Sequence, residues 1–252
     1  MKTKFNLLLI VSLAVLIPMK SKAQSKDDHV SAYTFQWKDA VSGEMKYLSY
    51  LPKDYDAKGK KTWPLMLFLH GAGERGSDVQ RVAIHGPISE VKQGKDFPFI
   101  IIAPQCPDRK MWDNESLLKL LGHAIEKYSV DTNRIYLTGL SMGGYGTWKR
   151  GLSYPEKFAA IVPICGGCNM IEVILGPRDK ADAFKSLPVW AFHGAKDDVV
   201  PLSESERVVD ALKKYGVKEV KFTVYPEAKH NSWTEAYKNP ELYEWMLKHS
   251  RQ

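Results

Sequence analysis

Short runs of hydrophobic or β-branched residues recur along the chain, and turn residues bound each run. The runs at 65–69 and 99–103 are apolar without alternation, which is typical of strands that are buried on both faces in a parallel sheet. Strands at a solvated surface would instead alternate apolar and polar residues. The pattern predicts strands at 47–51, 65–69, 99–103, 134–138, 159–164, 189–192 and 220–225.

Between these runs lie segments in which apolar residues recur at helical spacing. In the segment 115–128, for example, Leu117, Leu121 and Ile125 fall on one stripe. The same reasoning predicts helices at 115–128, 142–153, 204–215 and 241–248. Strand and helix alternate from about residue 65 onward, which predicts an α/β fold with a doubly wound, mostly parallel sheet of about eight strands flanked by helices. In such sheets ligands bind at the carboxyl ends of the strands.

Residues 1–23 have the pattern of a secretory signal peptide. Lys2 and Lys4 provide a positive start, an apolar run covers 5–17, and small residues precede a cleavage site after Ala23. The apolar run is shorter than the roughly 20 residues that a bilayer-spanning helix needs. We therefore expect an exported protein, periplasmic or extracellular, without a stable membrane anchor.

Composition and charge narrow the functional classes. The 252 residues carry a formal charge of +7, from 36 Lys and Arg against 29 Asp and Glu. Four of the lysines and none of the acidic residues lie in the leader, which leaves 32 basic against 29 acidic residues, and we expect no nucleic-acid partner. Residues 24–252 contain no repeat and no linker rich in Gly, Ser or Pro, which favours a single domain. The sequence leaves the oligomeric state open.

The clearest chemical motif is a Gly-x-Ser-x-Gly pattern with Ser141 at its centre. This serine follows the predicted strand 134–138 and precedes the predicted helix 142–153. A serine on a tight strand-to-helix turn adopts strained backbone angles, and flanking glycines are needed where a Cβ would clash. A serine hydroxyl becomes a good nucleophile only when a base takes its proton. We interpret Ser141 as a nucleophile that needs two further groups downstream.

Two later loops supply these groups. The loop 193–201 follows a predicted strand and carries adjacent carboxylates at Asp197 and Asp198. Only one of them can face the serine, because neighbouring residues of an extended loop point to opposite sides, and the spacing favours Asp197. His230 follows the last predicted strand and is the expected general base, whereas His193 is expected to support its loop by hydrogen bonding. The chain order Ser, Asp, His is the one that this topology imposes.

A serine nucleophile also needs donors for the negative charge that develops on the carbonyl oxygen under attack. A His-Gly-Ala-Gly stretch follows the second predicted strand, a position from which a backbone N–H can reach that oxygen. We assign the oxyanion donors to the N–H groups of Ala72 and Met142. In the same loop we expect His70 to be structural, and Glu74 and Arg75 to form an ion pair.

These motifs resemble those of the secreted bacterial esterases of the α/β-hydrolase superfamily. That group includes feruloyl and acetyl xylan esterases and polyhydroxybutyrate depolymerase-like enzymes, and is also described as prolyl-oligopeptidase-like or dienelactone-hydrolase-like. The similar stretches are 69–76, 104–107, 139–146, 189–201 and 230–233. The resemblance implies an α/β-hydrolase fold and serine-hydrolase chemistry, with Ser141 as nucleophile, His230 as acid and base, and Asp197 as the residue that orients the histidine.

The chain departs from the family pattern at Cys168, where a glycine is expected. Cys165 and Cys168 form a Cys-x-x-Cys pair, and Cys106 is the third cysteine. Three cysteines do not make a disulfide scaffold. The pair lacks a thioredoxin-like context and a histidine at zinc-binding spacing. We therefore expect a local disulfide or buried thiols, and neither a metal nor another cofactor.

The expected partner is an ester substrate, either small or linked to a polysaccharide. Only a short segment separates the strand that ends at Ile164 from the strand that begins near Pro188, which predicts no large lid and an open pocket. Trp112 and Trp233 lie at the functional edge of the sheet, where they either stack on a sugar or aromatic acyl group or pack in the core. The leading hypothesis is removal of acetyl or feruloyl groups from plant polysaccharide fragments.

Two alternative functions stay open on the sequence. A serine peptidase of the prolyl-oligopeptidase type would use the same three residues, but this chain is too short to include a propeller domain that would gate the site. A catalytically idle carbohydrate-binding protein would keep the fold with a defective site, whereas every required residue type is present here. Equal turnover of ester and amide analogues would favour the peptidase, and sugar binding without ester cleavage would favour the binding protein.

Overall fold

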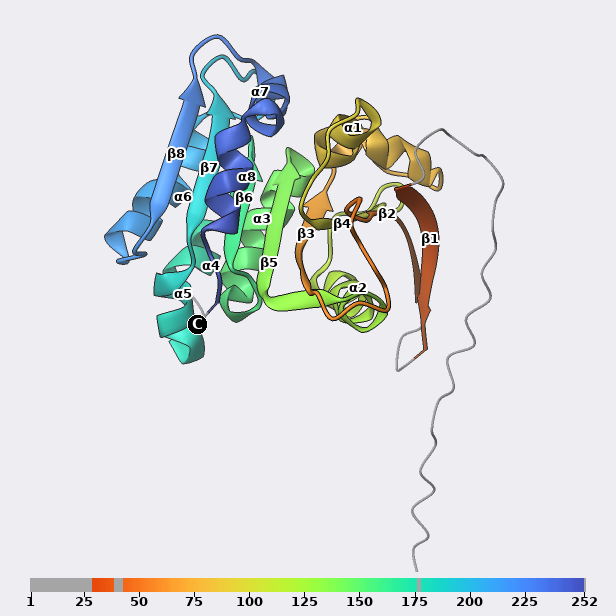
Figure 1. The fold of residues 1–252 in the computed structure, drawn as a ribbon. Coiled ribbons are helices and arrows are strands. Elements are labelled where there is room, and N and C mark those ends of the chain that lie inside the picture. The colour runs from red at the N-terminus through yellow and green to blue at the C-terminus, as the bar shows by residue number, and fades with distance from the viewer. Residues whose placement is uncertain (1–28, 39–42, 176–177, 252) are drawn as a thin grey trace, which may run out of the picture.

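An eight-stranded sheet organises the computed structural model, which describes residues 29–38, 43–175 and 178–251 (Figure 1). In chain order the strands are β1 (Val30–Trp37), β2 (Gly43–Tyr50), β3 (Trp63–Leu69), β4 (Ile100–Pro104), β5 (Val130–Leu140), β6 (Ala160–Ile164), β7 (Val189–Gly194) and β8 (Val220–Tyr225). Across the sheet the order is β1-β2-β4-β3-β5-β6-β7-β8. The pairs β1–β2 and β2–β4 are antiparallel and the other pairs are parallel, so the sheet is mostly parallel, as predicted.

Helices cover both faces of this sheet. The α-helices are α1 (Gly86–Lys92), α2 (Asn114–Lys127), α3 (Met142–Ser153), α4 (Met170–Leu175), α5 (Ala181–Ser186), α6 (Ser203–Lys214), α7 (Trp233–Lys238) and α8 (Pro240–Leu247). Short 3₁₀ helices are η1 (Ala72–Glu74), η2 (Val79–Ala83), η3 (Pro155–Lys157), η4 (Arg178–Lys180) and η5 (His230–Ser232).

The central strand β3 shows why its sequence is apolar without alternation. Leu65, Leu67 and Leu69 belong to one buried cluster together with α2, α3 and α6. Met66 and Phe68 belong to a second buried cluster together with α1, α7 and α8. Both faces of the strand are therefore covered, which requires an apolar residue at every position.

Every strand that the sequence pattern predicts is present, with ends that differ by a few residues. The pattern missed β1, an edge strand whose residues are exposed or only half-buried. It also missed α1, α4, α5 and α7, which have six or seven residues each and are too short to show helical periodicity. Between β6 and β7, where no large lid is expected, the described residues form α4, η4 and α5.

The parallel arrangement brings the functional loops to one edge of the sheet. The carboxyl ends of β3, β5, β7 and β8 all point the same way, and the loops that follow them carry the candidate residues. The signal peptide predicted at 1–23 lies outside the described residues, and the single domain predicted for 24–252 stays a prediction. Within the described part of the chain, no helix combines the length and apolar character needed to cross a bilayer.

Candidate active site

Ser141 lies on a sharp turn between β5 and α3. Its backbone angles, φ 52° and ψ −116°, are strained for a residue that carries a side chain. Two hydrogen bonds hold the turn in place. The Ser141 N–H donates to the carbonyl oxygen of Ile164 over 3.0 Å, and the Ser141 carbonyl oxygen accepts from the N–H of Tyr145 over 2.9 Å.

The glycines on either side of Ser141 are required by close backbone contacts. A Cβ at Gly143 would lie 1.9 Å from the carbonyl oxygen of Leu69. A Cβ at Gly139 would lie 2.5 Å from the carbonyl oxygen of Gly143. The backbone of a central strand or of a helix cannot move aside as the end of a flexible side chain can. The two glycines are therefore needed for close packing as well as for the strained turn at Ser141.

His230 and Asp197 reach the serine from two other loops. His230 begins η5, which follows β8, and Asp197 lies in the loop after β7. The Nε2 atom of His230 is 2.9 Å from the Oγ of Ser141, and the Nδ1 atom of His230 is 2.8 Å from the Oδ2 of Asp197. Because a carboxylate can only accept, Nδ1–H donates to it, and Nε2 of the neutral ring can accept the serine proton. The structure thus brings together the three residues that the sequence singled out.

The carboxylate of Asp197 is held from several sides. Its Oδ1 accepts from the N–H groups of Val199 and Val200, each over 2.9 Å. Its Oδ2 lies 3.2 Å from the Nε2 of His193. Burial by itself would raise the pKa of Asp197, but the hydrogen bonds from His230 and the two backbone N–H groups outweigh burial and lower the pKa below its usual value. The group is therefore ionised at neutral pH.

Of the two adjacent carboxylates, the one of Asp197 is turned inward toward the histidine. Asp198 is exposed, whereas the side chain of Asp197 is fully buried. His193 is also fully buried, with its Nδ1 2.7 Å from the Oγ of Ser205 and its Nε2–H donating to the carbonyl oxygen of Val200 over 2.9 Å. These bonds tie the loop to the first turn of α6, which is the support predicted for His193. No sequence signal pointed to Ser205.

The two N–H groups assigned to the oxyanion site both begin helices. Ala72 is the first residue of η1, and Met142 is the first residue of α3. The first N–H groups of a helix have no acceptor within it, so both can be offered to a ligand. Glu74 steadies the loop because its Oε2 accepts from the N–H of Gly71 over 3.0 Å. The role of Ala72 and Met142 as oxyanion donors stays a prediction.

The ion pair predicted between Glu74 and Arg75 is not formed. Glu74 is buried, and its Oε1 lies 3.9 Å from the Nε2 of His85. Arg75 instead donates to the carbonyl oxygens of Ala72 and Lys110, over 3.0 and 3.3 Å. The prediction failed because adjacent residues of a turn point to different sides, and here the carboxylate turns inward while the guanidinium lies at the surface.

His70 has the structural role that the sequence predicts. Its fully buried ring donates through Nδ1–H to the carbonyl oxygen of Gly71 over 2.6 Å and accepts at Nε2 from the N–H of Cys106 over 3.0 Å. Burial lowers the pKa of His70 to about 4. The ring is therefore neutral at neutral pH, and both hydrogen bonds persist.

The two tryptophans at the edge of the sheet differ in their surroundings. Trp112 is only 7% exposed, and its indole N–H donates to the carbonyl oxygen of His70 over 3.2 Å, so its ring packs in the core. Trp233 is half-buried and lies edge-on against His230, with ring centroids 5.2 Å apart. Trp233 is thus the more exposed of the two and lies beside the base, and its contact with a ligand stays a prediction.

All three cysteines are free and buried, which decides between the two alternatives for Cys165 and Cys168 in favour of thiols. Burial raises the pKa of Cys106 to about 11 and those of Cys165 and Cys168 to about 12. Cys165, Asp197 and His230 offer ligand atoms within 4.8 Å of one another. A thiol that stays protonated is a poor metal ligand at neutral pH, and the histidine and carboxylate already bond each other, so this group fits a metal poorly.

A mostly parallel eight-stranded sheet, a serine on a strained strand-to-helix turn, and a histidine and buried carboxylate on later loops together define an α/β-hydrolase. Residues 108–239 match the family described as Phospholipase/Carboxylesterase, a range that includes the three clustered side chains. The chain belongs to this family.

Curated relatives and solved structures agree with this assignment. The chain is 27% identical over 150 residues to the bifunctional acetylxylan esterase/xylanase XynS20E of Neocallimastix patriciarum, a match that covers 57% of this chain and 20% of that protein. It is 24% identical over 221 residues to the poly(3-hydroxyoctanoate) depolymerase of Pseudomonas fluorescens, which covers 76% of this chain and 77% of the relative. The chain thus spans about a fifth of the first relative and about three quarters of the second.

Two solved structures are similar in fold. A thermostable esterase superposes with a TM-score of 0.68 at 35% identity, over 87% of this chain and 63% of its own. A ferulic acid esterase superposes with a TM-score of 0.66 at 19% identity, over 86% of this chain and 96% of its own. The second similarity concerns the fold alone.

Proposed function

We propose that the protein is a serine carboxylic-ester hydrolase that works through an acyl-enzyme intermediate. The observation that carries the proposal is the series of two hydrogen bonds that joins Ser141 to His230 and His230 to Asp197, over 2.9 and 2.8 Å. Membership of a family described by carboxylesterase activity supports the same reaction. Ser141, where this series of hydrogen bonds starts, lies on the strained turn that presents a nucleophile in this fold.

The geometry suggests how the first half of the reaction proceeds. The Oγ of Ser141 attacks the ester carbonyl carbon while Nε2 of His230 takes the hydroxyl proton. The ionised Asp197 accepts from Nδ1–H throughout, which keeps the ring in the right tautomer and stabilises its protonated form. The oxyanion is stabilised by the N–H groups of Ala72 and Met142, and one such donor is worth about 3 kcal/mol in a transition state.

The second half of the reaction repeats these steps with water. The imidazolium of His230 returns its proton to the alcohol oxygen as the C–O bond breaks, which leaves the acyl group on Ser141. Water then gives a proton to Nε2 and attacks the acyl carbon. Collapse of this second oxyanion releases the carboxylic acid and returns the proton to Ser141.

Acetyl or feruloyl esters on plant polysaccharide fragments are the proposed substrates. A relative named as an acetylxylan esterase/xylanase supports this choice, and so does the resemblance of the sequence motifs to those of feruloyl and acetyl xylan esterases. Between β6 and β7 the described residues form only short helical elements, which suits a bulky carrier that stays in solvent. The leader pattern at 1–23 supports export to the periplasm or the medium.

Steady-state kinetics on three substrates test the proposal: p-nitrophenyl acetate, methyl ferulate and acetylated xylo-oligosaccharides. We expect ester hydrolysis by the parent chain and a loss of at least about 10³-fold in kcat for Ser141→Ala. Ser153→Ala is a matched control at the far end of α3 and should retain the parent rate. Full activity of Ser141→Ala would refute the mechanism, and equal turnover of matched amides would indicate a peptidase.

A further inference from the structure

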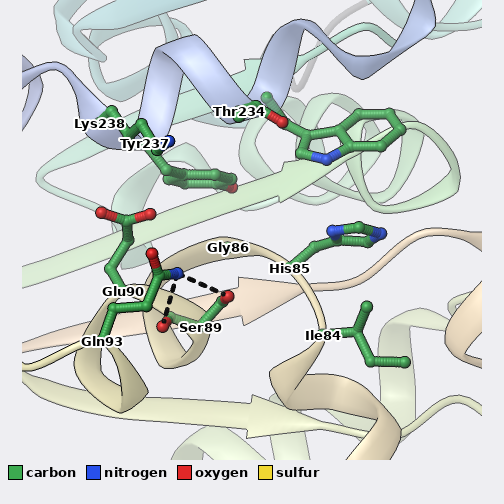
Figure 2. A pocket seen from close by; sticks show the side chains of 10 residues that line it. Ile84, His85, Gly86, Ser89, Glu90, Gln93, Thr234, Tyr237 and Lys238 are labelled. Carbon is green, nitrogen blue, oxygen red and sulfur yellow. Dashed lines mark hydrogen bonds between the residues drawn. The ribbon is translucent and has the colours of Figure 1, made fainter.

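A cavity of about 180 Å³ lies between α1 and α7, two helices that cover the same face of the sheet (Figure 2). Polar side chains from both helices and from the C-terminal cap of α1 line it: Ser89, Glu90, Gln93, Thr234 and Lys238. Whole ligand sites have volumes of roughly 300–1,000 Å³. The smaller volume suits one ring of a larger substrate.

One end of the cavity adjoins the proposed catalytic residues. His85 and Trp233 line this end, and their ring centroids are 5.4 Å apart. Trp233 in turn lies against the ring of His230. On the other side, the Nε2 of His85 is 3.9 Å from the Oε1 of Glu74. The Oε2 of Glu74 accepts a hydrogen bond from the N–H of Gly71. The cavity therefore begins beside both the base and the loop assigned to the oxyanion site.

Hydrogen-bonding groups gather at the other end. Figure 2 shows Ser89, Glu90 and Gln93 together on the α1 side, away from His85. The amide nitrogen of Gln93 donates to the carbonyl oxygen and to the hydroxyl of Ser89, over 3.2 and 3.3 Å. This arrangement leaves the amide oxygen of Gln93 as an acceptor, and the carboxylate of Glu90 is a second acceptor whose nearest cation, on Lys95, is 4.0 Å away.

An aromatic ring completes the lining. Tyr237 is buried, and its hydroxyl lies 2.9 Å from the Oγ1 of Thr138, so the hydroxyl is engaged inside the protein while the residue lines the cavity. Thr234, one helical turn earlier, adds an exposed hydroxyl. A carboxylate, an amide and a hydroxyl around one cavity match a sugar, which carries several hydroxyl groups.

The lining also distinguishes the two halves of an ester. An acetyl group has no donor for the carboxylate of Glu90 or the amide of Gln93, and a feruloyl group has a single phenol. Polar groups that are covered without a partner lose free energy, so an acyl group would bind here poorly. A sugar hydroxyl satisfies each acceptor instead.

We propose that this cavity binds a sugar ring of the alcohol part of the substrate, next to the ester carbon at Ser141. The inference rests on the proposed function, because it assigns the leaving group of that reaction to a place on the protein. Binding of a sugar ring in this cavity makes the enzyme selective for esters of carbohydrates over esters of simple alcohols.

Two substrates that share an acetyl group test the inference, acetylated xylo-oligosaccharides and p-nitrophenyl acetate. Gln93→Ala and Thr234→Ala each remove one polar group from the cavity, and both residues are exposed, so folding should be unaffected. We expect each variant to lower kcat/KM for the sugar ester, relative to p-nitrophenyl acetate, by about two- to tenfold, the value of one hydrogen bond. The double variant should show the product of the two effects.

Lys92→Ala is the matched control, since Lys92 is an exposed residue of the same helix that does not line the cavity. It should keep the parent ratio of the two rates. An unchanged ratio in the double variant would overturn the inference while leaving ester hydrolysis intact. Methyl ferulate serves as a third substrate. A fall in kcat/KM confined to methyl ferulate would also overturn the inference, because the cavity would then bind the acyl group. Absence of ester hydrolysis in the parent chain would refute the proposed function and the inference together.

Discussion

Mild acid should destabilise the fold through one buried histidine. The ring of His70 accepts from the N–H of Cys106 and donates to the carbonyl oxygen of Gly71, and it has no exposed surface. Protonation would place a new N–H against the N–H of Cys106. Burial accordingly lowers the pKa of His70 from 6.5 to about 4.

The size of the effect follows from this difference in pKa. Between pH 6.5 and about 4 the unfolded chain binds a proton at His70 that the folded chain does not. The contribution of the neutral ring to the free energy of unfolding is therefore complete above pH 6.5 and decreases as the pH falls through this window. At about 1.4 kcal/mol per pKa unit the complete loss is about 3 kcal/mol. About 2 kcal/mol of this is already lost at pH 5.

Urea unfolding of the parent chain and of His70→Asn, each at pH 7 and pH 5, measures the effect. Asparagine offers a donor and an acceptor but does not titrate, and other titrating groups are common to both proteins. The variant should be less stable at pH 7, but between the two pH values the parent should lose about 2 kcal/mol more than the variant. Equal losses in the two proteins would refute the reasoning.

Three further outcomes follow from the site. Asp197→Asn should lower kcat by about 10³- to 10⁴-fold with little change in KM, because an amide favours the wrong tautomer of His230; a steady-state rate within tenfold of the parent would contradict this. Gly143→Ala should reduce both activity and the thermal midpoint, since its Cβ would lie 1.9 Å from the carbonyl oxygen of Leu69, and a parent-like melting curve would show that the turn can adapt. The three cysteines should resist a thiol reagent at neutral pH and react fully in urea, because all three are buried; rapid labelling of the native chain would argue against the burial described here.

The strands were predictable because burial on both faces leaves an unmistakable pattern. Runs such as that of β3 are apolar at every position, and the structure places them in the centre of the sheet. The edge strand β1 was missed because its residues are at most half-buried, so its sequence carries no such constraint. The helices α1 and α7 were missed because six or seven residues make fewer than two turns.

The candidate site was likewise predictable only in part from the sequence. Ser141 and His230 could be found because each follows a predicted strand at the carboxyl edge of the sheet. The choice of Asp197 over Asp198 is explained only by the loop, in which the N–H groups of Val199 and Val200 hold the first carboxylate inward. The cavity could not be predicted at all, because it depends on how two unpredicted helices pack against each other.

Labelling with a fluorophosphonate, followed by peptide mapping, tests whether Ser141 is the nucleophile. The reagent forms a stable covalent bond with a serine only when a base activates its hydroxyl. We expect one adduct per chain, on the peptide that contains Ser141, with parallel loss of ester hydrolysis and no adduct in Ser141→Ala. Labelling of a different residue, or an unlabelled Ser141 in a chain that still hydrolyses esters, would contradict the mechanism.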